Sequence, residues 1–333
     1  MTATRTNPAS RDEPPSDLQA RLARVMPEIE FRVHQPLIEA INRLKKERDA
    51  VILAHNYQTP EIFHGVADVV GDSLRLAREA ARTDATRIVV CGVHFMAETA
   101  KLLNPDKTVL IPDVDAGCSL AESITPQDVQ RLRAVHPDTP VVAYVNTSAA
   151  VKALSDVCCT SANAVQIVES LGVPRVIMIP DVFLARNVAA STAVEIIAHD
   201  GRCIVHEQFR AQDIRELRET DPQLAILAHP ECPPDVLHEA DFAGSTEAMA
   251  RWVGQHRPRR VVLLTECSMS DNVAVQHPEV EFQRPCNLCP YMKRITLTKI
   301  LDCLASDTNA VTIPAHTAHR ARQAIERMLQ LSI

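Results

Sequence analysis

Two cysteines near the C-terminus, Cys286 and Cys289, stand three positions apart, and a proline follows the second. Thiolates at this spacing can both reach one soft metal, for which zinc or an iron–sulfur centre is the usual occupant. The simple alternative is a pair of buried cysteines that pack as small apolar residues. The spacing alone leaves both interpretations open, and the elements that would position these thiols must decide.

The composition narrows the possible functions. The 333 residues are 46% hydrophobic, which suffices for a large core, and the net charge is −7. No block of lysine or arginine is present, so no nucleic-acid partner is expected. A small acidic substrate would need a local positive charge, supplied by helix N-termini or a metal. No apolar run reaches the ~18 residues of a membrane span. We therefore expect a cytoplasmic protein without a membrane partner.

The ten cysteines are expected to be reduced, because cytoplasmic compartments keep thiols free. The glycine-rich patterns of dinucleotide-binding folds and of P-loops are both absent from the sequence. These observations argue against a nucleotide cofactor and leave the thiols as the distinctive chemical groups.

The chain repeats itself after an N-terminal stretch. Residues 1–34 are rich in proline, arginine and acidic residues and predict a mobile tail. An apolar strand at 51–55 recurs at 141–144 and 225–229, at intervals of about 85 to 90 residues, and each copy follows a helical segment. The repeat predicts domains at 35–124, 125–210 and 211–333, the last with C-terminal helices.

A second strand in each repeat opens with an arginine: Arg87, Arg175 and Arg260. Strands that alternate with helices indicate βαβ units with parallel sheets covered on both faces. The sequence therefore predicts an α/β protein of three pseudo-symmetric repeats, each a small parallel sheet flanked by helices, around a central cluster site.

One cysteine occupies a corresponding place in each repeat. Cys118, Cys203 and Cys289 follow the three arginines by about 30 residues. Three thiolates that meet on the axis would hold three irons of a [4Fe–4S] cluster and leave the fourth iron open to substrate as a Lewis acid. Such an iron suits dehydration, whereas the remaining cysteines, Cys286 included, are expected in the core or beside the site.

Polar residues follow the first strand of each repeat, where ligands of parallel sheets bind. These candidates for substrate binding or proton transfer are His55, Tyr57, Tyr144, Asn146, His229 and Glu231. Helix starts at Ser73, Ser161 and Thr246 are either ordinary N-caps or anion sites formed by free backbone N–H groups. His206, three residues after Cys203, either neighbours the metal or faces the substrate.

These segments together resemble the quinolinate synthase (NadA-type) family. The motifs that carry the resemblance are His55-Asn-Tyr57-Gln, Gly71-Asp-Ser73-Leu, Ala116-Gly-Cys118-Ser-Leu, Tyr144-Val-Asn146-Thr-Ser, His229-Pro-Glu231-Cys and Cys289-Pro-Tyr-Met. The match runs from about Gln35 to the C-terminus. Some members carry Cys-x-x-Cys-x-x-Cys near the end, but Gln283 stands here in place of the first cysteine.

The resemblance implies condensation of iminosuccinate with dihydroxyacetone phosphate to quinolinate, with loss of phosphate and water, in NAD biosynthesis. It implies a [4Fe–4S] cluster on Cys118, Cys203 and Cys289, and an enzyme that supplies iminosuccinate as an expected partner. The substrate-binding positions that it implies are His55, Ser73, Tyr144, Asn146, Ser161, His206, His229, Glu231 and Thr246. Glu231, His229, Tyr57 and Tyr144 are the catalytic candidates.

Two other classes of protein stay open at this point. One is a different hydro-lyase that uses an open-iron cluster. The other is a zinc or redox module, without enzymatic activity, built on Cys286 and Cys289.

Overall fold

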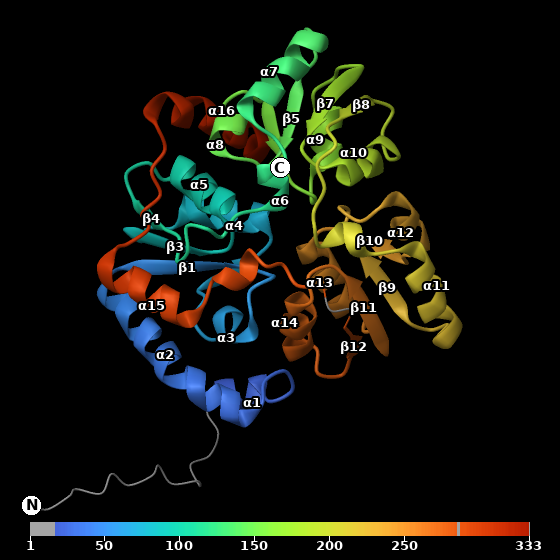
Figure 1. Ribbon diagram of the computed structural model, residues 1–333. Helices are drawn as coiled ribbons and strands as arrows, with labels where there is room; N and C mark the ends of the chain where they lie inside the picture. The colour runs from blue at the N-terminus through green and yellow to red at the C-terminus, as the bar shows by residue number, and fades with distance from the viewer. Residues whose placement is uncertain (1–16, 285–286, 333) are drawn as a thin grey trace, which may run out of the picture.

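Three parallel sheets of four strands organise the protein (Figure 1). The computed structural model describes residues 17–284 and 287–332. In spatial order the sheets are β2 (Val69–Gly71), β1 (Ala50–His55), β3 (Arg87–Cys91), β4 (Thr108–Leu110); β6 (Val157–Cys159), β5 (Val141–Tyr144), β7 (Arg175–Ile179), β8 (Glu195–Ala198); and β10 (Phe242–Ala243), β9 (Ala225–Ala228), β11 (Arg260–Leu264), β12 (Glu281–Gln283). The strand order is the same each time, so the predicted fold class is confirmed.

Helices cover the sheets and connect their strands. In chain order they are α1 (Asp17–Leu22), α2 (Glu28–Glu47), α3 (Pro60–Phe63), α4 (Ser73–Arg82), α5 (His94–Leu103), α6 (Ser119–Glu122), α7 (Pro126–Val135), α8 (Ala149–Lys152), α9 (Ala164–Ser170), α10 (Val182–Ala189), α11 (Ala211–Thr220), α12 (Pro234–Glu239), α13 (Thr246–His256), α14 (Ser268–Gln276), α15 (Leu297–Ser306) and α16 (Ala315–Leu331), with 3-10 turns η1 (His206–Gln208) and η2 (Met292–Arg294). None of the described helices is both long and apolar enough to span a membrane.

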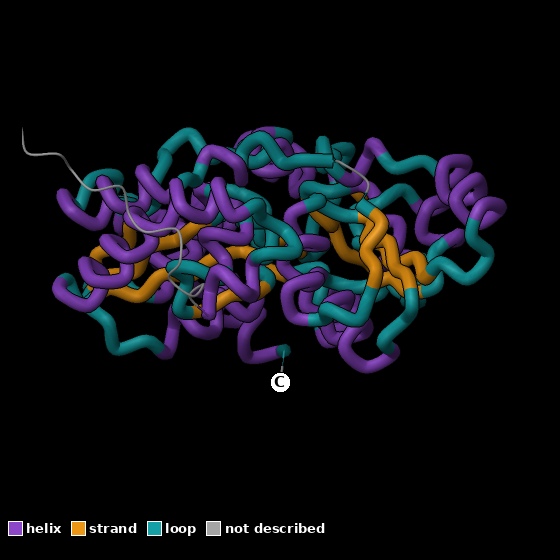
Figure 2. Tube along the Cα trace, turned by 90° about the horizontal axis from the view of Figure 1, so that it is seen from below, coloured by secondary structure: helices purple, strands orange, loops and turns teal. Residues whose placement is uncertain are grey.

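The central strands are buried on both faces, as expected for parallel sheets with helical cover. Ile52, Ile88, Ile177 and Val262, one from each of four central strands, have no exposed surface. The three units lie around a common centre in Figure 1, and the view from below in Figure 2 shows a flattened assembly. The strands therefore bring their following loops toward one place.

An aspartate fixes the start of the first strand in each unit in the same way. Asp68, Asp156 and Asp241 each accept a hydrogen bond from a strand amide, at 2.8, 2.7 and 2.8 Å, and pair with a basic residue of the preceding helix at 2.7, 2.6 and 2.7 Å. The amides belong to Ile52, Val141 and Ile226, and the basic residues are Lys45, Arg133 and Arg218. The same aspartate, strand amide and basic residue therefore occur at equivalent positions in all three units, which supports the interpretation of the chain as a threefold repeat.

The chain is helical earlier than the sequence predicts. α1 and the start of α2 form a small apolar cluster in which Leu22, Met26 and Phe31 are buried and Val275 packs against them. Pro27 separates the two helices, so no single helical period runs through the segment that was expected to be a tail. Residues 1–16 lie outside the described residues.

The C-terminal helices pack away from the third sheet. α15 lies against α2 of the first unit, and α16 lies against α8 and β6 of the second (Figure 1). The last part of the chain therefore joins the first two units, although it follows the third in sequence. The domain boundaries at residues 34, 124 and 210 stay predictions.

Replacing Asp156 by alanine should lower the free energy of unfolding by about 1–3 kcal/mol, because the Val141 N–H loses its acceptor and Arg133, which keeps its bonds to the Leu154 carbonyl, loses its ion-pair partner. Urea unfolding followed by circular dichroism measures the change. The matched control is Asp200→Ala, whose carboxylate is exposed and pairs only with Arg202, so about 0.5 kcal/mol or less is expected. Equal effects of the two substitutions would contradict a structural role for Asp156.

Candidate active site

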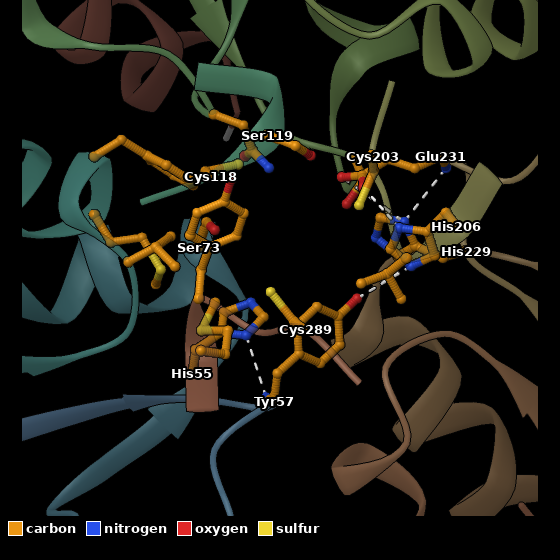
Figure 3. Close-up of a pocket in the computed structure, with 18 of the residues that line it drawn as sticks. His55, Tyr57, Ser73, Cys118, Ser119, Cys203, His206, His229, Glu231 and Cys289 are labelled. Carbon is orange, nitrogen blue, oxygen red and sulfur yellow. Dashed lines mark hydrogen bonds and ion pairs between the residues drawn. The ribbon is translucent and has the colours of Figure 1, made fainter. Parts of the chain in front are cut away.

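A cavity with about 710 Å³ of atom-free space lies where the three units meet (Figure 3). The residues that the sequence singled out for chemistry all line it: His55, Tyr57, Ser73, Cys118, Tyr144, Asn146, Ser161, Cys203, His206, His229, Glu231, Thr246 and Cys289. They come from all three units and from strand ends, helix starts and loops. The structure thus brings the whole predicted set together, while the role of each residue stays a prediction.

The three predicted metal ligands differ from the other described cysteines in exposure. Cys118, Cys203 and Cys289 are partly exposed, whereas the other cysteines among residues 17–284 and 287–332 are buried. Figure 3 shows the three side chains around the same open space. Cys286 lies outside the described residues. A donor set of three thiols that face one cavity fits a cluster held by three cysteines.

Hydrogen bonds join the three loops that carry these cysteines. Ser119 Oγ donates to the carbonyl of Arg202 and accepts from the Ile204 amide, both at 3.2 Å, which ties the Cys118 loop to the Cys203 loop. The hydroxyl of Tyr291 donates to Glu122 at 2.8 Å. The longer Asn287 Nδ2 contact, 3.4 Å from a carbonyl oxygen, joins the loop before η2 to the one before η1. The thiols are therefore placed by contacts that need no metal.

Burial raises the pKa of the Cys118 thiol to about 12 and raises the pKa values of Cys203 and Cys289 as well. Without a metal these side chains are thus neutral thiols at pH 7. A bound metal ion reverses this preference, because a coordinating thiol is deprotonated outright. Metal binding at this site would therefore release protons.

Glu231 is the charged centre of the cavity wall. Its side chain is buried, accepts the Tyr144 hydroxyl proton at 2.5 Å and lies 2.8 Å from His206 Nδ1. Burial opposes ionisation, but the adjacent His206 ring, together with the hydrogen bonds from His206 and Tyr144, lowers the pKa of Glu231 below its ordinary value. Glu231 is consequently a carboxylate at neutral pH that can accept a proton only from a stronger acid than usual.

A chain of hydrogen bonds runs from Glu231 to Tyr57. Because a carboxylate only accepts, His206 Nδ1 donates to Glu231. Thr265 Oγ1 lies 2.9 Å from His206 Nε2 and 2.6 Å from the Tyr57 hydroxyl. A proton can thus pass between the Tyr57 hydroxyl and Glu231 along three short contacts.

His55 and His229 occupy equivalent positions and have equivalent contacts. Each ring accepts at Nδ1 the backbone N–H of the residue two positions later, at 3.2 Å for His55 and 3.3 Å for His229. Burial lowers the pKa of both rings to about 3. Both are therefore neutral imidazoles that carry their proton on Nε2 and can donate it in a hydrogen bond.

Two helix N-termini lie in the cavity wall. Ser73 and Thr246 are the first residues of α4 and α13, and the cap residues Asp72 and Ser245 hydrogen-bond to each other at 3.0 Å. The third expected start lies later than predicted, because Asn163 caps the following helix and binds the amide of Thr160. Ser161 therefore reaches the cavity from a turn.

A second potential metal group lies on one side of the cavity. Cys203, His206 and Glu231 each offer a ligand atom, and these atoms lie within 4.8 Å of one another. Two of the three already bind each other, since His206 donates to Glu231. A metal at this position would have to displace that hydrogen bond.

The sequence analysis missed an ion pair beneath the site. Lys293 Nζ lies 2.8 Å from the fully buried Glu266 and donates to the Tyr57 carbonyl at 2.6 Å and to Ser268 Oγ at 2.7 Å. Glu266 also lies 3.4 Å from the Cys289 amide. Thr265 and Glu266 follow the second strand of the third unit, so a search of the ends of the second strands would have found them.

These observations define an α/β enzyme whose internal cavity carries thiols, neutral histidines and an ionised carboxylate. The family model described as "Quinolinate synthetase A protein" matches residues 39–330. Quinolinate synthase 1 of Mesorhizobium japonicum is 67% identical over 94% of this chain and 97% of its own length. Quinolinate synthase of Agrobacterium fabrum is 65% identical over 95% and 92%, and that of Xylella fastidiosa 67% over 88% and 87%. The chain belongs to this family of enzymes.

The ion pair beneath the site yields a stability prediction. Replacing Lys293 by methionine leaves the buried Glu266 carboxylate without its partner and should cost about 3 kcal/mol of unfolding free energy. The double variant Lys293→Met/Glu266→Gln removes both charges and should recover part of this loss. Chemical unfolding of the two proteins tests the prediction. A double variant no more stable than the single one would show that the charge imbalance is not the cause.

Proposed function

We propose that this enzyme condenses iminosuccinate with dihydroxyacetone phosphate to give quinolinate, phosphate and water, a step of NAD biosynthesis, with a [4Fe–4S] cluster on Cys118, Cys203 and Cys289. One observation carries the proposal: in a chain of the quinolinate synthase family, one partly exposed cysteine from each unit lines a shared cavity. The proposed location is the cytoplasm, and the proposed partner is an enzyme that supplies iminosuccinate.

When bound, such a cluster would supply an iron without a protein ligand, which polarises a hydroxyl or carboxylate oxygen during dehydration. The first role of the protein's own residues would be to bind the substrates. Ser73 and Thr246, at the two joined helix N-termini, would hold carboxylate or phosphate oxygens through backbone N–H groups and hydroxyls. Ser161 would contribute from the second unit.

The remaining wall would orient the reacting atoms. His55 and His229 are neutral donors at Nε2, so they suit carboxylate or carbonyl oxygens. The buried Asn146 Oδ1 has no hydrogen-bond partner among the described residues and lines the cavity, so it can accept from an amine or hydroxyl of the substrate. These contacts would hold the two substrates in a geometry that allows the new bonds to form.

Proton transfer would fall to the network around Glu231. The carboxylate holds the Tyr144 hydroxyl on one oxygen and His206 Nδ1 on the other. Tyr144 can take a proton from the substrate as it passes its own to this carboxylate, His229 can donate a hydrogen bond from Nε2 to the reacting oxygen, and the path through His206 and Thr265 reaches the Tyr57 hydroxyl. Glu231, His229, Tyr57 and Tyr144 are therefore the proposed catalytic residues.

One observation favours a second candidate. The group of Cys203, His206 and Glu231 could hold a divalent metal and run a different hydro-lyase reaction. Metal analysis and a comparison of iminosuccinate plus triose phosphate with simple hydroxy acids as substrates would separate this candidate from the first.

Replacing any one of Cys118, Cys203 or Cys289 by alanine should remove the cluster and reduce quinolinate formation at least about a hundredfold. Anaerobic iron and sulfide analysis, visible absorption and a quinolinate assay give the result. The matched control is Cys303→Ala, a buried cysteine of the core. A Cys289→Ala protein with full iron content and activity would remove the cluster from the proposal.

Replacing Glu231 by glutamine should leave iron content unchanged and lower kcat by about 10²–10⁴-fold, because the network loses the carboxylate that accepts from Tyr144 and His206. Steady-state kinetics with both substrates measures the change. The matched control is Glu207→Gln, an exposed neighbour of His206, which should behave as the wild type. Turnover that is unchanged in Glu231→Gln would exclude a role in proton transfer.

A further inference from the structure

The cavity lacks an obvious partner for anions. Its described lining residues include no lysine and no arginine. The acidic side chains among them, Asp72 and Glu231, both accept hydrogen bonds and offer no positive charge. The proposed substrates carry carboxylate and phosphate groups, and the protein has a net charge of −7. Helix N-termini offer only partial charges, each equivalent to roughly half an elementary charge. A full positive charge nearby would decide how tightly such anions bind.

Lys152 supplies such a charge from behind the wall. Its side chain is fully buried at the end of α8, and Nζ donates to the carbonyl of Val145 at 2.7 Å and to that of Thr147. Among the described residues no carboxylate lies within 4.0 Å of this ammonium group. The buried Lys45, in contrast, pairs with Asp68 at 2.7 Å.

The position of Lys152 links it to the cavity in two ways. Its ammonium group lies 5.4 Å from the centre of the Phe95 ring, and Phe95 lines the cavity. The two carbonyls that it binds flank Asn146, which also lines the cavity. Only one layer of side chains and backbone therefore separates the charge from a bound ligand.

The surroundings of Lys152 favour a charge that acts on the cavity. Burial lowers its pKa, whereas the neighbouring Cys158, Glu98 and Cys118 side chains act in the opposite direction, and two carbonyls with an aromatic face stabilise the cation. Glu98, the acidic neighbour, accepts the Ala149 amide at 2.9 Å instead of binding Nζ. A charge in a medium of low polarity acts over a longer distance than it does in water. A methionine would fill the same space without the cost of burying a charge.

We propose that Lys152 is a positioning and affinity-determining residue, whose buried ammonium group holds the Val145–Thr147 segment and attracts the anionic substrate through the Phe95 and Asn146 wall. This inference rests on the proposed function, because it requires an anionic ligand. It assigns the positive charge to a residue that does not touch the substrate.

The test compares ligands that share a pyridine ring and differ in charge. Pyridine-2,3-dicarboxylate, pyridine-2-carboxylate and pyridine-2-carboxamide carry two, one and no negative charges at pH 7.5, and calorimetry measures their binding to the anaerobically purified full-length protein. In Lys152→Met we expect dissociation constants to rise about tenfold for the dianion and about threefold for the monoanion, with no change for the neutral amide.

Two further variants keep the test sharp. Lys45→Met removes a buried lysine that Asp68 neutralises, so it should lower stability without changing any of the three affinities. Glu98→Gln removes the negative charge near Lys152 while it keeps an acceptor for the Ala149 amide, and it should tighten dianion binding about two- to threefold. Glu98→Gln also answers the question if Lys152→Met fails to fold.

The possible outcomes distinguish a failure of the role proposed for Lys152 from a failure of the proposed function. If Lys152→Met weakens all three ligands equally, or leaves all three unchanged, the role of its charge is overturned. An unchanged dianion affinity in Glu98→Gln would have the same meaning. If the wild-type protein shows no preference for the dianion, the proposed function itself fails, whatever the variants do.

Discussion

The hydrogen bonds among the three cysteine loops are the constraint on which the site depends. Each loop leaves a different sheet, and a common cavity exists only if all three loops stop at the same place. Ser119 binds both a carbonyl and an amide of the Cys203 loop, and Tyr291 reaches Glu122 beyond Cys118. These contacts hold the loops that carry Cys118, Cys203 and Cys289 against one another, so the positions of the three thiols depend on each other.

The same loops connect to the network that could move protons. Tyr144 of the second unit donates to Glu231 of the third, and Tyr57 of the first unit lies against Thr265 of the third. A relative movement of any two units would lengthen one of these bonds. Lys293 adds a further connection, because it holds the Tyr57 carbonyl and the carboxylate that lies beside the Cys289 amide. Substrate geometry and thiol geometry are therefore set by overlapping contacts.

Much of this arrangement could be predicted from the sequence, because it follows local patterns. Apolar strands recur at a constant interval, and the residues after them, such as His55 and His229, had to share an edge of parallel sheets. The packing of α15 and α16 on the first two units could not be predicted, since contacts between distant segments leave no periodic signal. The roles of Lys152 and Glu266 could not be predicted from the sequence either. A charged residue in a short helix or after a strand is exposed by default, and only the folded structure shows that it is buried.

The electrostatics of the site depend on the lack of lysine and arginine among the described residues that line the cavity. Direct contact of a substrate with lysine or arginine would be strong, but an ammonium group in the cavity would also pair with Glu231, the carboxylate at the centre of the proposed proton-transfer network. Lys293 avoids this conflict by pairing with Glu266. Lys152 avoids it by lying behind Phe95, where two carbonyls hold its ammonium group. A positive charge kept one layer away can attract an anion without binding to the groups that carry out the chemistry.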